Sequence, residues 1–262
     1  MSTYYKILPE DLICRGFQYH EGLNIDTNTI DKNESGYGLS FSDAKHILHS
    51  CSSGSMIAKV EIPNDAIVYH FNDKSKADRI ILKNIRPLWS VETIEDLIRE
   101  GVEFKSCRIC VIYEALKNDY SDVAKYLIEQ STGIHNYTLC HACVFGSLDV
   151  VKCLVEHGAD IHADNDHALR VASDYGHLEI VEYLVEQGAD IHADADYALR
   201  IASENGYLDI VKCLVEHGAN IHACDDYAIQ YAGTPEIEEY LKSLRFSIMN
   251  VARKSEATRG GV

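Results

Sequence analysis

The chain has 262 residues, of which 46% are hydrophobic and 25% charged, a composition typical of a soluble protein with room for two domains. Its 41 acidic and 24 basic residues give a net charge of −17. Such an excess of negative charge repels phosphate backbones and anionic lipid surfaces, so we expect no nucleic-acid partner and no membrane partner.

The first 86 residues do not repeat, and they alternate short apolar or aromatic runs with turn residues. Turn chemistry at 33–36 and 63–65 separates these runs, which predicts a small, mainly β domain over residues 1–86. The expected strands are residues 4–8, 16–19, 38–41, 56–63, 66–71 and 79–83. Residues 42–51 are expected to form a helix with Ser42 as its N-cap.

Residues 87–106 are predicted to connect this domain to the rest of the chain. They contain a helix over residues 90–100, with Ser90 as its N-cap and Gly101 as its stop. The apolar residues around this helix indicate that the N-terminal domain docks on the segment that follows.

The remainder of the chain is organised by an internal repeat. Residues 145–163, 175–193 and 205–223 carry nearly the same sequence at a spacing of 30 residues. Each copy contains two short patterns of helical period, and neither helix can bury its apolar stripe alone. The copies must therefore stack into a solenoid with one continuous core.

Degenerate copies precede and follow these units, as expected of the caps that close a solenoid core against water. We therefore predict about five units over residues 107–244, with a polar tail over residues 245–262. The tail is small and polar in composition, which is typical of a disordered terminus.

The repeated pattern A-L-R-V-A-S-x-x-G-H-L-E-I-V-x-x-L-V-E-x-G-A-D-I-H-A resembles the ankyrin repeat. Two departures distinguish it: the usual Thr-Pro-Leu-His opening is replaced, and the unit is shorter than the family's ~33 residues, which predicts a tighter turn in place of the hairpin finger. Thirty-residue units with this sequence pattern, and the N-terminal domain that precedes them, resemble ankyrin proteins of giant amoebal viruses. The expected fold class is α+β: an all-α ankyrin solenoid preceded by a small mainly-β domain.

Cysteines and histidines recur at spacings that a metal site also uses. Two Cys-x-x-Cys pairs occupy residues 107–110 and 140–143, but both lie on expected helices, where aligned copies carry small packing residues. We predict buried, reduced thiols and no metal.

His162, His192 and His222 recur once in each unit. Stacked helices lie ~8–10 Å apart, which is too far for these histidines to share one ion, so we predict that they form a structural ladder.

One order of residues in the N-terminal domain is similar to that of ADP-ribosyltransferases. Arg15, then Tyr37 and Ser40, and then Glu61 follow the family's sequence of an Arg, a Ser or Tyr motif and a final Glu. Glu61 comes early for that role, and the later strand offers Asp78 where a Glu is wanted. This resemblance supplies an alternative reading of the domain as a nucleotide-using transferase.

Ankyrin arrays bind proteins with their turn tips and the exposed side of their first helices, and the resemblance transfers this role residue by residue. The expected binding residues are Asn165, Asp166, His167, Arg170, Asp174, Ala195, Asp196, Tyr197, Arg200, Glu204, Asp226, Tyr227 and Gln230. Tyrosine and arginine among acids suit an interface, because these side chains dominate binding energies.

The favoured function is a non-enzymatic protein–protein interaction protein of viral origin, acting on a host or viral protein, with no cofactor. We expect a monomer in the cytoplasm, the host cytoplasm if the protein is viral. Its nine cysteines suit a reducing compartment, and its first residues show no signal peptide. The alternative is a transferase-like N-terminal domain whose substrate the repeats deliver.

Overall fold

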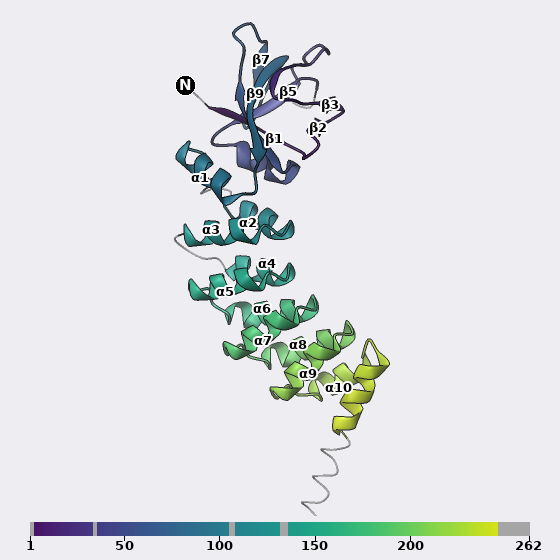
Figure 1. Ribbon diagram of the computed structural model, residues 1–262. Coiled ribbons are helices and arrows are strands. Elements are labelled where there is room, and N and C mark those ends of the chain that lie inside the picture. Colours follow the sequence, from purple (N-terminus) through teal and green to yellow (C-terminus); the bar gives the residue numbers. More distant parts are fainter. Residues whose placement is uncertain (1–2, 34–35, 105–107, 132–135, 246–262) are drawn as a thin grey trace, which may run out of the picture. The chain divides into compact units, whose positions relative to one another are not determined.

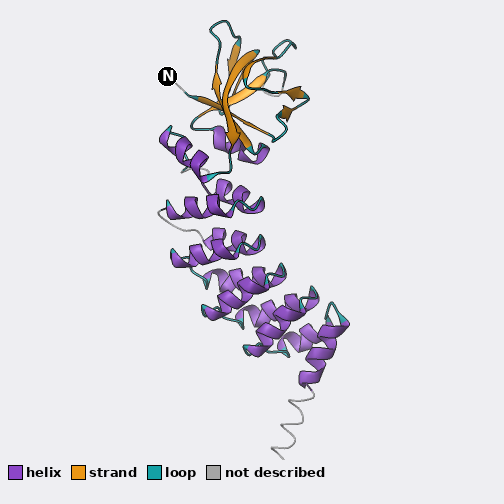
Figure 2. Ribbon diagram, viewed as in Figure 1, coloured by secondary structure: helices purple, strands orange, loops and turns teal. Residues whose placement is uncertain are grey.

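The computed structural model describes residues 3–33, 36–104, 108–131 and 136–245 (Figure 1). The chain forms two compact units, Met1–Ser131 and Thr132–Val262. Strands occur in the first unit, and paired helices make up the described part of the second (Figure 2). This confirms the expected class, a strand-rich region followed by helical repeats. The predicted boundaries near residues 86 and 107 stay a prediction, and the predicted tail lies outside the described residues.

The strand-rich region is built on one antiparallel sheet in the order β4-β9-β6-β1-β5-β8-β7. Its strands are β1 (Tyr4–Leu8), β4 (Gly22–Ile25), β5 (Leu39–Asp43), β6 (Met56–Glu61), β7 (Val68–His70), β8 (Ser75–Ala77) and β9 (Arg79–Pro87). A separate two-stranded hairpin consists of β2 (Ile13–Cys14) and β3 (Phe17–Gln18). The 3-10 helix η1 spans Ile47–Ser53.

The core of this region is formed by side chains that alternate along the strands toward one side. Its buried members are Leu8, Tyr19, Leu39, Phe41, Ala58, Val60, Ala77, Ile80 and Leu82. The expected helix over residues 42–51 is wrong at its start, because Ser42 is buried within β5 and pairs with Tyr5 of β1. The chain turns only after Asp43, whose carboxylate accepts a hydrogen bond from the backbone N–H of His46 at 3.0 Å.

The sheet continues into the connecting helix α1 (Val91–Arg99), which the sequence predicted. The Ser90 hydroxyl accepts a hydrogen bond from the backbone N–H of Thr93 at 3.2 Å, and Gly101 follows with a positive φ. A capped helix end of this kind satisfies one of the backbone donors that the first turn leaves without partners.

The first helical pair, α2 (Arg108–Lys117) and α3 (Ser121–Glu129), belongs to the same compact unit as the strands. The Trp89 ring stacks on Tyr120 with their centroids 5.5 Å apart, and α1 packs against α3. On the sheet side, the Tyr5 hydroxyl donates to the Glu100 carboxylate at 2.8 Å, and Arg86 forms an ion pair with Asp96 at 2.6 Å. The N-terminal module therefore docks on the first helical pair, as the sequence indicated.

The second unit is a row of helical pairs. Its helices are α4 (Asn136–Val144), α5 (Leu148–Glu156), α6 (Ala163–Asp174), α7 (Leu178–Glu186), α8 (Ala193–Glu204), α9 (Leu208–Glu216) and α10 (Ala223–Gln230), and residues 235–245 are also helical. The first helices α4, α6, α8 and α10 pack side by side, as do the second helices α5, α7 and α9. No helix in the described part of the chain is both long and apolar enough to cross a membrane.

The glycines that keep the repeat period meet two demands at once. Gly146 and Gly176 have φ values of 71° and 81°, a region that residues with a side chain rarely adopt. A Cβ atom on Gly146 would lie 2.6 Å from the His177 ring of the next repeat, and one on Gly176 would lie 2.7 Å from Tyr207. The Nε2 atom of His177 also lies 3.0 Å from the Val144 carbonyl oxygen. These glycines therefore end one helix and leave room for a side chain of the next repeat to pack against the backbone.

The packing between repeats gives a first testable prediction. Leu184 in α7 is 0% exposed and lies between α5 and α9, both of which pack against its helix. Leu184→Ala leaves a cavity that the neighbouring repeats cannot fill, so it should lower the free energy of unfolding by ~2–5 kcal/mol in urea denaturation of the full chain. Glu182→Ala is the matched control on the exposed side of the same helix and should change stability by less than ~0.5 kcal/mol. Equal losses for both variants would contradict this assignment of the core.

Candidate functional site

Neighbouring repeats are joined by a compact left-handed turn. Residues 164–166 have φ values of 52–58°, and residues 194–196 have values of 53–56°. Three successive residues in this conformation are rare, because it brings Cβ close to the carbonyl oxygen, and Asp and Asn tolerate it best. Asp and Asn fill most of these positions, with Ala195 as an exception. This is the tighter turn that the short repeat unit predicted.

A buried carboxylate closes the turns at 164–166 and 194–196 and reaches the next repeat. Oδ1 of Asp166 lies 2.9 Å from Nδ1 of His162 and accepts a hydrogen bond from the backbone N–H of Asp190 at 2.8 Å. Asp196 repeats both contacts one unit later. Asp166 and Asp196 are each only 5% exposed. Both were expected at the binding surface, and the structure instead places their carboxylates inside, where they hold successive repeats in register.

The histidine column lies at the turns of the repeats, one residue per turn. His162, His192 and His222 each contact the aspartate four residues later, as a structural ladder would. Within the described residues, no cluster of three His, Cys, Asp or Glu side chains is placed to hold an ion. Cys143 is buried, which raises the pKa of its thiol, but Cys140 is half-buried and Cys110 is exposed, so the prediction of a buried thiol is wrong for Cys110. Cys107 lies outside the described residues.

Arginines on the first helices cap the left-handed turns. Arg170 donates from Nε to the Asn165 carbonyl oxygen at 3.1 Å and from Nη2 to that of Asp164 at 2.8 Å. Arg200 makes the same two bonds in its own repeat, at 3.0 and 2.9 Å. The guanidinium group therefore supplies donors to carbonyls that the turn leaves without a helical partner.

The same arginines alternate with tyrosines from successive repeats. The guanidinium carbon of Arg170 lies 5.5 Å from the ring centre of Tyr197, and that of Arg200 lies 5.3 Å from Tyr197 and 5.4 Å from Tyr227. These distances are in the range of cation–π attraction. The Tyr227 hydroxyl donates to the Glu204 carboxylate at 2.9 Å, which raises the pKa of the phenol. The result is a surface whose large side chains are held in fixed positions.

Two exposed tyrosines extend this surface and were not among the expected binding residues. Tyr137 on α4 is 69% exposed, and its ring centroid lies 4.6 Å from that of His141. Tyr231 is 56% exposed, and its ring lies 4.5 Å from that of Tyr227. Tyr137 stands in the same repeat column as Tyr197, so the repeat alignment already contained the signal for it. The arginine–tyrosine surface is then Tyr137, Arg170, Tyr197, Arg200, Tyr227 and Tyr231.

The other expected binding residues fall into two groups. Asn165, Ala195, Glu204 and Gln230 are exposed, and His167, Asp174 and Asp226 are half-buried. Asp226 also forms an ion pair with Arg245 at 3.2 Å.

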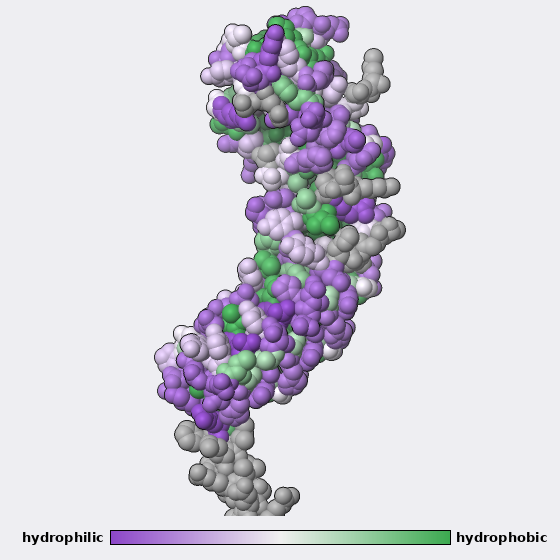
Figure 3. Space-filling model, turned by 180° about the vertical axis from the view of Figure 1, so that it is seen from behind, coloured by the Kyte–Doolittle hydropathy of each residue, from purple (hydrophilic) through white to green (hydrophobic). Residues whose placement is uncertain are grey.

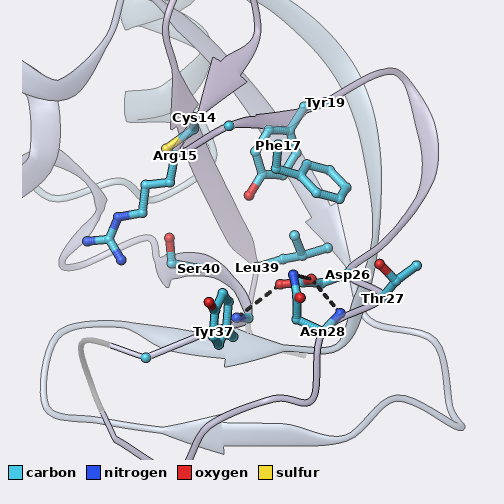
Figure 4. A pocket seen from close by; sticks show the side chains of 13 residues that line it. Cys14, Arg15, Phe17, Tyr19, Asp26, Thr27, Asn28, Tyr37, Leu39 and Ser40 are labelled. Atoms are coloured by element: carbon cyan, nitrogen blue, oxygen red, sulfur yellow. Dashed lines mark hydrogen bonds between the residues drawn. The ribbon is translucent and has the colours of Figure 1, made fainter.

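A pocket of about 470 Å³ lies in the strand-rich region, and it is lined by three of the four residues of the transferase alternative (Figure 4). Arg15 comes from the turn between β2 and β3, Tyr37 from the segment just before β5, and Ser40 from β5 itself. Glu61 is not part of the lining: it lies exposed at the end of β6 in an ion pair with Lys83 at 2.6 Å. The glutamate that the transferase reading requires is therefore not at the pocket.

Stacked helical pairs joined by short turns define a helical-repeat protein. The sequence model described as "Ankyrin repeats (3 copies)" matches residues 90–165, 112–195 and 169–248. The chain therefore belongs to the ankyrin repeat family, as its repeated pattern indicated.

A relative in Acanthamoeba polyphaga mimivirus, named as a putative ankyrin repeat protein, is 31% identical over 148 residues. The match covers 53% of this chain and 45% of the relative, so the chain corresponds to about half of that protein's length. This match confirms the expected resemblance to an ankyrin protein of a giant amoebal virus.

The strained turn gives a second prediction. Ala195 has a φ of 55°, whereas the equivalent residues in the neighbouring turns are Asn165 and Asp225. Because asparagine tolerates this conformation better than alanine, Ala195→Asn should raise the free energy of unfolding by up to ~1 kcal/mol in urea denaturation. Ala198→Asn places the same side chain at a buried helical position and should be destabilising. A stability loss in Ala195→Asn would show that the turn is not left-handed at this residue.

The arginine contacts give a third prediction. Arg200→Ala removes two hydrogen bonds to the turn and contacts with two rings, so it should cost about 1–2 kcal/mol of unfolding free energy. Arg200→Lys should recover only part of this loss, because an ammonium group cannot donate in the fork geometry of a guanidinium. Lys212→Ala is the control, since its ion pair with Asp209 is exposed and 3.8 Å long. Equal stability of Arg200→Ala and Lys212→Ala would show that the capping bonds contribute little.

Proposed function

We propose that this protein is a non-enzymatic interaction protein that binds a protein partner through its arginine–tyrosine surface. Ankyrin repeats imply protein–protein interaction, and this surface presents the residue types that carry most of the energy of such interfaces. The observation that supports the proposal best is the alternation of Arg170, Tyr197, Arg200 and Tyr227, whose side chains are already fixed by one another. Binding to such a surface costs less side-chain entropy than binding to free arginines.

The charge around this surface indicates the chemistry of the partner. Asp164, Asp194 and Asp225 are exposed at successive turns, and the whole chain carries a net charge of −17. Figure 3 shows one face of the second unit, on which hydrophilic residues predominate and apolar areas are small. A partner with a basic, hydrogen-bonding surface would be complementary to these acids and would be attracted to them over a distance.

The mimivirus relative supports a viral setting for this interaction. In our proposal the protein acts as a monomer in the cytoplasm of an infected cell, on a host or viral protein and without a cofactor. The transferase alternative has less support, because Glu61 is paired with Lys83 outside the pocket. Release of nicotinamide from NAD by the purified chain would favour that alternative over ours.

A fourth prediction tests the surface with variants that leave the folded core unchanged. Tyr137 and Tyr231 are exposed, so the double variant Tyr137→Ala/Tyr231→Ala should keep the thermal stability of the parent. It should nonetheless lose about tenfold or more in partner affinity, as expected of interface tyrosines. Capture from infected-cell lysate, quantified by mass spectrometry and repeated with the purified partner, provides the measurement.

Tyr175→Ala is the matched control for this experiment. Tyr175 is also an exposed tyrosine, 51% accessible, but it lies at the end of α6 and makes no part of the arginine–tyrosine surface. The control should bind like the parent protein, and binding of both should weaken as salt screens the acidic turns. A partner that is lost equally with Tyr175→Ala, or that is retained by the double variant, would place the binding surface elsewhere.

A further inference from the structure

We propose that the pocket in the strand-rich region binds a small planar molecule that carries an anionic group at one end and hydrogen-bond donors at the other. This site is separate from the proposed protein-binding surface and does not depend on it. Its lining comes from the β2–β3 hairpin on one side and from segments 26–28 and 36–40 on the other (Figure 4). Its volume of about 470 Å³ is in the range of small-molecule sites.

The first observation is an arginine without a counter-ion. Arg15 and Gly16 form the two-residue turn between β2 and β3, with φ values of 52° and 78°. Such turns favour Asn and Gly, so an arginine at the first position is strained and invites a functional explanation. Among the described residues, no carboxylate pairs with Arg15, although the chain has 41 acidic residues against 24 basic ones.

The second observation is a buried lysine behind the same wall. Lys6 on β1 is 4% exposed, and its Nζ donates to the Ser40 carbonyl oxygen at 2.7 Å. The ammonium group also lies 4.5 Å from the ring centre of Tyr19, and both Ser40 and Tyr19 line the pocket. Burial lowers the pKa of Lys6 to about 8, so most of the group is still protonated at neutral pH.

Arg15 and Lys6 therefore place two positive charges at one wall of the pocket, Arg15 in its lining and Lys6 behind it. Neither has a carboxylate partner among the described residues. In a site partly shielded from water, their field stabilises an anion more than it would at an open surface. Arg15 can donate to the anion directly, while Lys6 acts through the wall. An anionic group is thus the part of the ligand that this end of the pocket recognises.

The opposite side of the pocket carries an acceptor. Oδ1 of Asp26 accepts hydrogen bonds from the backbone N–H and the Nδ2 of Asn28, at 3.0 and 2.9 Å, and Oδ2 accepts one from the backbone N–H of Gly38 at 3.2 Å. These bonds fix the carboxylate, and Oδ2 keeps capacity for a further donor. Figure 4 shows Asp26 across the pocket from Arg15. A ligand that spans the two ends needs an N–H or O–H group at the Asp26 end.

Aromatic side chains border the space between these ends. Phe17 lies on the hairpin side, and Tyr37, which is 63% exposed, lies on the other (Figure 4). An exposed tyrosine next to a polar pocket offers a face on which a planar ring can stack. A ring with an amino group and a phosphate or carboxylate satisfies all three features of the pocket.

The proposal can be tested with four probes on the full-length chain. AMP and 4-aminobenzoate carry a planar ring, an amino group and a phosphate or carboxylate; adenosine and aniline are their uncharged counterparts. Calorimetry or ligand-observed NMR should show binding of at least one anionic probe, about tenfold or more tighter than its neutral counterpart, and weakened by salt. AMP binding alone would assign a phosphate, and 4-aminobenzoate binding alone a carboxylate.

Variants then locate the binding. Arg15→Gln lies on an exposed turn and should reduce affinity for the anionic probe about tenfold, whereas Lys45→Gln, an exposed lysine outside the pocket, should leave it unchanged. Lys6→Met should also weaken binding if circular dichroism shows that it folds, but the Arg15 comparison decides without it. The proposal is overturned if neither anionic probe binds at about 10 mM, if the neutral probes bind equally well, or if Arg15→Gln and Lys45→Gln are indistinguishable.

Discussion

The second unit depends on one hydrogen bond that recurs between its repeats, from a backbone N–H to a buried aspartate of the preceding repeat. Asp166 accepts this bond from Asp190, and Asp196 accepts it from Asn220. A buried carboxylate without such donors would be costly, so the bond and the burial require each other. Each aspartate is also the last residue of its left-handed turn. Its hydrogen bond to the following repeat therefore ties the turn of one repeat to the turn of the next. The spacing of Arg170, Tyr197, Arg200 and Tyr227 along the surface follows from this contact.

This arrangement gives the arginines two roles. Arg170 and Arg200 complete the turns by binding their carbonyl oxygens, and the same guanidinium groups lie against tyrosines of the next repeat. A partner that contacts the surface therefore meets side chains whose entropy is already lost in folding. The arginines cannot be changed without disturbing the turn, so mutations at Arg200 mix effects on stability and on binding. Exposed tyrosines such as Tyr137 separate the two effects, because no turn depends on them.

Much of the fold could be predicted where local pattern and tertiary packing agree. The helical pairs and the Ser90 cap followed from period and capping chemistry. The sequence-based prediction failed where the hydropathy of a residue does not indicate its backbone conformation or its burial. Asp166 was expected outside because ankyrin arrays bind proteins with their turn tips, but the left-handed turn directs its carboxylate inward. The strands β4 and β8 were missed because they carry polar residues, Asn24 and Lys76, that are buried only because they bind backbone carbonyls. The binding residues could be placed in repeat columns, whereas Arg15, Tyr37 and Ser40 met in one pocket only through the topology of the sheet.

The distribution of charge connects the two proposed sites. In a chain with a net charge of −17, many of the described basic side chains have an acidic partner within reach, as Arg86 and Lys83 do. Where a cation instead binds backbone carbonyls or has no described partner, its charge is available to something else. On the repeats, Arg170 and Arg200 bind turn carbonyls and lie against aromatic rings, and Arg170 also forms an ion pair with Asp194 at 3.4 Å. The other exposed aspartates of the turns suit a basic protein. At the hairpin, Arg15 faces open space above a buried ammonium group, which suits a small anion. The two proposed sites therefore suit ligands of opposite charge: a basic protein at the repeats and a small anion at the hairpin.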